Sequence, residues 1–110
     1  MLLQKKGKGY SPAENNPENY HGIGFLSSNE ADGRRNEVLD RFSQFMRRAE
    51  GRNTFLAHEN EKGIYGDTAV RCLDLMKNFS KDGLKCIFDP ANFLQCNEET
   101  DKAYTMLRDY

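Results

Sequence analysis

The sequence predicts an α/β fold in which three strand–helix units follow one another along the chain. Three short apolar runs, at residues 22–27, 54–59 and 84–89, begin about thirty residues apart, the usual size of a βαβ unit. Each run is followed by a stretch in which apolar residues recur at the helical spacing i, i+3, i+4. This alternation favours a parallel three-stranded sheet covered by helices.

The three helices are expected at residues 34–50, 67–79 and 98–110. Gly51 is a natural stop for the first helix, and Asp67 or Thr68 is a suitable N-cap for the second. The residues expected on the buried faces are Val38, Leu39, Phe42, Phe45, Met46 and Ala49 in the first helix, Val70, Leu73, Met76 and Phe79 in the second, and Ala103, Met106, Leu107 and Tyr110 in the third.

The chain divides into two unequal parts. Residues 1–20 are rich in Lys, Gly, Pro and Asn and lack an apolar period, so we expect a polar leader without ordered structure. Residues 21–110 form the predicted α/β domain, in which residues 28–33 are expected to be a turn and Pro90 ends the third strand. The total of 110 residues is enough for one domain with a modest core.

Composition excludes several classes of protein. The net charge is −1 and the mean hydropathy is −0.85, so neither a nucleic-acid partner nor a membrane partner is expected. No apolar run reaches membrane-spanning length, and the N-terminus lacks the order of a signal peptide. The cysteines, Cys72, Cys86 and Cys96, are odd in number and have no paired spacing. They favour reduced thiols with structural roles and a cytoplasmic location.

Two strands end in an acidic residue. Side chains alternate along a strand, so Phe55, Ala57 and Glu59 share one face of the second strand, while Ile87 and Asp89 share one face of the third. The carboxyl ends of neighbouring parallel strands lie at the same edge, which in α/β barrels carries the active site. Two carboxylates there suit a hard divalent cation such as magnesium or manganese. Helix capping or simple solvation of both acids is the structural alternative.

A doubly wound, flavodoxin-like sheet stays open as an alternative fold. The residues after the first apolar run, GIGFLSS, are NEADG, which match neither a Rossmann glycine fingerprint nor a phosphate-binding P-loop.

Two stretches carry a resemblance to a known family. LAHENEKGIYGDT (56–68) and IFDPANF (87–93), preceded by GFLSS and the helix NEVLDRFSQFMRRAE, resemble the sugar phosphate isomerase/epimerase family. The resemblance covers roughly residues 21–110 and implies the fourth to sixth strand–helix units of a xylose isomerase-like TIM barrel. The predicted fold is then a (βα)3 portion of that barrel.

The resemblance also implies a chemistry. It implies that Glu59 and Asp89 bind a divalent metal, Mn or Mg, and that Glu59 is the catalytic acid/base. Such a residue moves a proton between adjacent carbons of a sugar or sugar phosphate through an enediolate. The position three residues after the Asp is often His in the family but is Asn92 here, which argues against a trinuclear zinc site and leaves Asn92 to bind a substrate hydroxyl.

Four further residues lie close to Glu59 in the sequence. Glu61 and Lys62 lie in the loop that follows the strand and are candidates for contact with substrate, with solvation as the alternative. Asn60 is expected to orient Glu59. His58 points to the opposite face of the strand by parity, which favours helix packing or a supporting role over a ligand role.

The family's remaining ligands lie on strands that this chain does not contain. We therefore expect the chain alone to be inactive, and its open sheet edges to permit self-association. Two alternatives to an isomerase or epimerase portion stay open. The first is a non-enzymatic barrel remnant or interaction fragment, and the weaker second is abasic-site DNA repair of the endonuclease IV kind.

Overall fold

The computed structural model describes residues 2–5 and 28–110, which form a small α/β structure around one three-stranded sheet. The strand order is β1 (Leu2–Lys5), β2 (Thr54–Glu59), β3 (Lys85–Ile87). Strands β2 and β3 are parallel, which confirms the predicted direction of this pair. The predicted strand at 22–27 lies outside the described residues.

Strand β1 was not expected from the sequence. It pairs antiparallel with β2, with Leu2 opposite Ala57 and Lys5 opposite Thr54. Four residues are too few for an alternating pattern to be visible, so the pairing comes from the free edge of β2 rather than from a local signal. In the part of the chain that the structure describes, the sheet is open and no barrel is formed.

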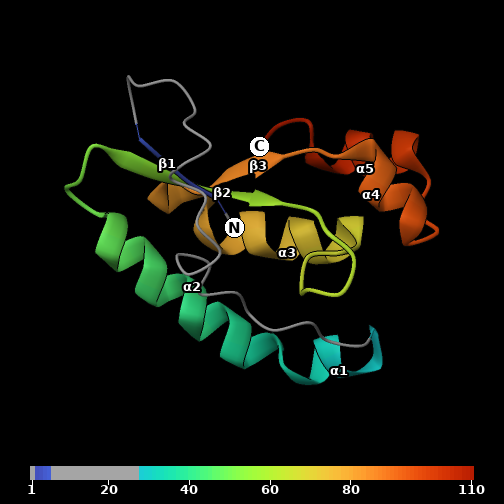
Figure 1. Cartoon of the computed structure of the whole chain (residues 1–110), viewed down its shortest axis with the longest axis horizontal. Coiled ribbons are helices and arrows are strands. Elements are labelled where there is room, and N and C mark those ends of the chain that lie inside the picture. Colours follow the sequence, from blue (N-terminus) through green and yellow to red (C-terminus); the bar gives the residue numbers. More distant parts are fainter. Residues whose placement is uncertain (1, 6–27) are drawn as a thin grey trace, which may run out of the picture.

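Two long helices cover one face of this sheet (Figure 1). They are α2 (Arg35–Ala49) and α3 (Ala69–Phe79), close to their predicted bounds. Helix α3 begins at the N-cap Thr68, whose hydroxyl accepts a hydrogen bond from the N–H of Arg71 at 3.4 Å. The residues predicted as a turn form a short helix, α1 (Ser28–Gly33), and its Ala31 is buried against the core.

The C-terminal part of the chain is more helical than predicted. After the short 3₁₀ helix η3 (Ser80–Asp82) and β3, the chain forms α4 (Pro90–Gln95) and α5 (Thr100–Leu107). Pro90 does more than end a strand, because it occupies the first turn of α4, where its fixed φ suits a helix. None of the helices in the described residues is both long enough and apolar enough to cross a membrane.

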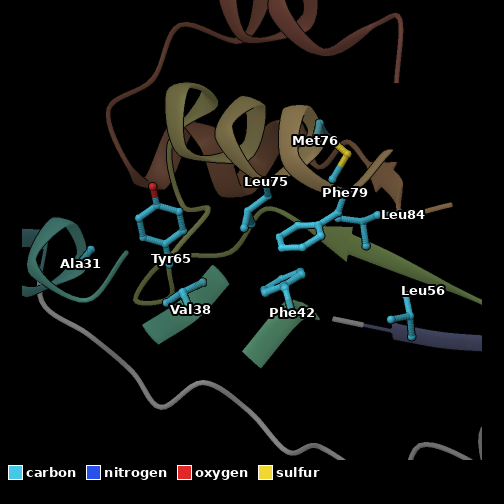
Figure 2. Packing of buried hydrophobic residues seen from close by; sticks show 9 residues of the cluster. All are labelled: Ala31, Val38, Phe42, Leu56, Tyr65, Leu75, Met76, Phe79 and Leu84. Carbon is cyan, nitrogen blue, oxygen red and sulfur yellow. The ribbon is translucent and has the colours of Figure 1, made fainter. Parts of the chain in front are cut away.

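The main core lies between the sheet and helices α2 and α3 (Figure 2). The rings of Phe42 and Phe79 stack there with centroids 5.6 Å apart. Leu56 of β2 joins them from the sheet. The buried residues of this cluster are Ala31, Val38, Phe42, Leu56, Tyr65, Leu75, Met76, Phe79 and Leu84.

A second, smaller core lies where α3 meets α4 and α5. It contains Ala69, Cys72, Phe93, Ala103 and Leu107. Because α3 packs against both cores, its buried face is wider than the predicted stripe and turned away from Val70, whose side chain is 66% exposed. Tyr110, also predicted to be buried, lies beyond the end of α5 and is 37% exposed.

Candidate functional site

The strand register brings the two strand-end acids to the same end of the sheet. In the parallel β2–β3 pair, Glu59 lies opposite Ile87, and Asp89 follows two residues later in extended conformation. Residues two apart in an extended segment share a face. Glu59 and Asp89 therefore leave the sheet at the same end and on the same face.

A buried asparagine joins the two strands just past this point. Asn60 is 1% exposed, and its side-chain amide makes two hydrogen bonds to the backbone of Asp89. Its Nδ2 donates to the Asp89 carbonyl oxygen at 2.8 Å, and its Oδ1 accepts from the Asp89 N–H at 2.8 Å. The amide thus continues the hydrogen bonding of the parallel pair beyond its last register position.

Asn92 completes the same network. Its backbone N–H donates to Oδ1 of Asp89 at 3.0 Å, so Asp89 is the N-cap of α4. Its side-chain Nδ2 donates to the carbonyl oxygen of Asn60 at 2.9 Å. Both asparagines are therefore committed to holding the junction between β2, β3 and α4, and one oxygen of Asp89 is used as a cap.

The Glu59 carboxylate differs from that of Asp89, because no described residue hydrogen-bonds to it or forms an ion pair with it. Its pKa is raised, first by partial burial and then by the negative charges of Asp89 and Glu61. Glu61 and Lys62 are exposed in the loop that follows β2. Among the described residues, the site thus holds several acidic groups and none that forms an ion pair with Glu59.

His58 lies on the other face of β2 and points into the helix layer. It is 1% exposed, its ring lies edge-on to Phe42 at 6.1 Å, and its Nε2 is 3.2 Å from the carbonyl oxygen of Gly66. A carbonyl oxygen can only accept, so this contact sets the Nε2–H tautomer. Burial lowers the pKa of His58 to about 4, so the ring is neutral at physiological pH.

Cys72 lies beside His58 but is not arranged as a nucleophile. Its thiol donates to the carbonyl oxygen of Gly66 at 2.9 Å, and its Sγ is 3.7 Å from Nε2 of His58. The thiol is fully buried, and burial raises its pKa far above the ordinary value. The Cys72–His58 pair is therefore a structural contact of the core.

The donor set at the sheet end fits a hard cation only loosely. Among the described residues, no three or more His, Cys, Asp or Glu side chains are grouped in a way that could hold a metal ion. Glu59 and Asp89 supply carboxylate oxygens, which magnesium and manganese prefer, and water would have to fill the other positions.

Sequence reasoning missed the main role of Asn60. The residue was expected to orient Glu59, whereas its side chain binds the backbone of Asp89. A polar residue directly after one buried strand, with a helix-capping Asp after the next, is the local signal that was available.

Comparison with known proteins gives short matches to 1-deoxy-D-xylulose-5-phosphate synthases. A segment of 23 residues is 74% identical to 1-deoxy-D-xylulose-5-phosphate synthase of Pelotomaculum thermopropionicum, and covers 21% of this chain and 4% of the synthase. The synthases of Desulforudis audaxviator and Lawsonia intracellularis are 65% and 70% identical over the same length, with the same coverage. The match thus spans about a twenty-fifth of these relatives. No family model and no solved structure matches the chain.

These findings overturn the predicted membership of the sugar phosphate isomerase/epimerase family. The isomerase or epimerase function is wrong with it, as are the alternatives that depended on the barrel. The physical reason is visible at Asp89, Pro90 and Asn92, which form a capped helix start. Any junction between a strand and a helix needs such a start, so this motif was less specific than the resemblance required.

Proposed function

We propose that this chain binds one hard divalent cation, Mg²⁺ or Mn²⁺, at the carboxyl ends of β2 and β3. The observation that carries the proposal is the Glu59 carboxylate, which is partly buried beside Asp89 and Glu61 and has no partner among the described residues. A bound cation would offset the mutual repulsion of these acids. Glu59 and Asp89 are the proposed ligands.

The frame around these ligands supports the proposal. The side chain of Asn60 holds the backbone of Asp89 at two points, and Asp89 caps α4 through one carboxylate oxygen. Its other oxygen is left for a ligand role. A rigid frame lowers the entropy cost of binding, because fewer side chains must be ordered when the ion arrives.

Two protein ligands leave most coordination positions of the ion to water. Mg²⁺ commonly binds in this way, through one or two carboxylates together with the oxygens of a second molecule. We therefore propose a small sugar or sugar phosphate as the molecule that shares the ion. Glu61, Lys62 and the amide oxygen of Asn92, whose Nδ2 is already bound to Asn60, are the groups nearest in sequence that could contact it.

The test is a titration of the full chain with Mn²⁺, followed by the loss of the electron paramagnetic resonance signal of free Mn²⁺. We expect a dissociation constant on the order of 1 mM for the unaltered chain, as is usual for weak oxygen-ligand sites. Glu59→Gln and Asp89→Asn should each weaken binding at least about tenfold, and Asn at position 89 keeps the capping ability.

Glu50→Gln is the matched control, because Glu50 is an exposed acid that precedes β2 at the opposite end of the strand. It should leave Mn²⁺ binding unchanged. Equal loss of binding in the control and in Glu59→Gln would show only general attraction of cations to a negatively charged surface and would refute the proposed site.

The 23-residue match favours a second candidate function, a part in the formation of 1-deoxy-D-xylulose 5-phosphate. The match covers only 4% of each synthase, so in this proposal the rest of the enzyme comes from outside these 110 residues. The experiment is to add the purified chain to a synthase that lacks the matching 23 residues. Restored product formation supports this candidate, and an inactive mixture of two folded chains counts against it.

A further inference from the structure

A cavity lies at the end of the sheet opposite to the carboxylate site. The last turns of α2 and α3 and the first residues of β2 and β3 meet there (Figure 1). The described residues enclose an open-sided space of about 920 Å³. Clefts of roughly 300–1,000 Å³ hold drug-sized molecules in other proteins. The cavity is separate from Glu59 and Asp89, which leave the strands at their other ends.

The inner wall of the cavity is apolar. Met46 comes from α2, Leu56 from β2 and Phe79 from α3. Leu56 and Phe79 belong to the main core, in which Phe79 stacks on Phe42 (Figure 2). A wall that is part of a packed core keeps its shape when a molecule binds, and apolar contact with it favours a ligand with an apolar body.

The rim of the cavity is charged. Arg47, Arg52 and Lys85 are exposed there, and none of the three forms an ion pair with a described residue. Two carboxylates, Glu50 and Asp82, lie on the same rim and are also unpaired within the described part of the chain. One positive charge is left over, which suits a singly charged anion better than a doubly charged phosphate ester.

Thr54 lines the cavity, but its hydroxyl is enclosed and does not open onto the cavity in this conformation. Its Oγ1 is buried and has no hydrogen-bond partner among the described residues. A buried hydroxyl without a partner is unfavourable. After rotation about χ1, this hydroxyl would be able to donate to an oxygen of a bound anion, so the ligand supplies the acceptor that the protein lacks.

From these observations the geometry points to a binding site for a small organic monoanion with an apolar body, such as an aromatic carboxylate or sulfonate. The apolar wall would hold the body, and the arginines and Lys85 at the rim would attract the anionic group. The proposal does not depend on the cation site, since the two lie at opposite ends of the strands.

The test uses two fluorescent probes that share an aromatic body and differ in charge. The anion 8-anilinonaphthalene-1-sulfonate should bind the full chain more tightly than the uncharged N-phenyl-1-naphthylamine. The double variant R47Q/R52Q should weaken binding of the anionic probe about tenfold and change binding of the uncharged probe less than twofold. Thr54→Val, which keeps the side-chain shape, should weaken the anionic probe about threefold.

Arg48→Gln is the matched control, because Arg48 is an exposed neighbour of Arg47 on α2 and does not line the cavity. It should bind both probes as the unaltered chain does, and far-ultraviolet circular dichroism should show that all variants are folded. The proposal is overturned if Arg48→Gln and the double variant lose equal affinity for the anion, or if the uncharged probe binds as tightly as the anion. If Thr54→Val binds the anionic probe with full affinity, the Thr54 hydroxyl takes no part in binding, and that part of the proposal is wrong.

Discussion

The side chain of Asn60 binds both backbone polar groups of Asp89, accepting from the N–H and donating to the carbonyl oxygen, each at 2.8 Å. The two residues are 29 positions apart in the sequence and belong to different strand ends. Because the amide occupies the place of a further strand residue, it fixes the distance between the end of β2 and the start of α4. The spacing between Glu59 and Asp89 therefore depends in part on this side chain.

Asn60→Ala should destabilise the fold. The change removes two hydrogen bonds. It leaves the partly buried N–H of Asp89 without a partner among the described residues, while the Asp89 carbonyl keeps only the longer bond from the Phe93 N–H at 3.3 Å. We expect the free energy of unfolding to fall by about 2–4 kcal/mol, measured by urea denaturation. Asn36→Ala is the control, since Asn36 is exposed in α2, and its effect should stay within about 0.5 kcal/mol. A similar small effect at Asn60 would contradict a structural role for the amide.

Stability should depend on pH through His58. Burial lowers its pKa from 6.5 to about 4 in the folded chain. The unfolded chain therefore binds the proton more tightly, and the free energy of unfolding falls as the pH drops from about 6.5 to 4. The loss should reach roughly 3 kcal/mol at the lower value. Measuring the free energy of unfolding of His58→Gln over the same pH range separates the contribution of His58 from that of the carboxylates. If this free energy changes with pH equally in the variant and in the unaltered chain, the prediction is wrong.

Gly66→Ala should be among the most damaging small substitutions. Gly66 has φ of +96°, and a Cβ there would overlap the ring of His58. Gly83→Ala is a sharp control, because Gly83 has φ of +102° but open space around the added atom. We expect about 1–2 kcal/mol of destabilisation at Gly83 from backbone strain alone, and at least about 2 kcal/mol more at Gly66. Equal losses measured by thermal unfolding would show that the contact with His58 is unimportant.

Glu59→Gln should have opposite effects with and without divalent cation. The raised pKa of Glu59 means that the folded chain disfavours its charged form, so stability declines as the pH rises past the ordinary glutamate value. In cation-free buffer at pH 7, removing the charge should slightly raise the melting temperature. Millimolar Mn²⁺ should raise the melting temperature of the unaltered chain but not that of the variant. If Mn²⁺ raises the melting temperature of the variant as much as that of the unaltered chain, Glu59 is not a ligand.

The helices α2 and α3 were predictable because their apolar residues repeat over several turns and their ends carry clear signals. Phe42 and Phe79 lie in the core as their spacing indicates. Helix α4 was not predictable in the same way, since six residues are too short for a period. Helix capping by Asp89 was kept only as the alternative to a metal-ligand role, and it is the capping role that the structure shows. Val70 was placed on the wrong face because α3 packs against two cores, a tertiary arrangement that a single stripe does not encode.

The parallel pairing of β2 and β3 was predictable from the order of elements, and it places Glu59 and Asp89 at one end of the sheet. The family was not. Strand-end acids and capped helix starts occur in α/β structures of many functions, so such residues carry information about local geometry rather than about a reaction. The network of Asn60 and Asn92 depends on contacts about thirty residues apart, which no local pattern shows.

Because Cys72 is buried, the rate at which its thiol is alkylated reports how often the fold opens spontaneously. Its sulfur is wholly enclosed and hydrogen-bonded to Gly66, whereas Cys86 and Cys96 are only partly covered. An alkylating reagent needs an accessible thiolate, so it reaches Cys72 only during the brief moments when α3 separates from β2. The ratio of its labelling rate in native chain to that in urea therefore measures how often this part of the molecule opens without any denaturant present.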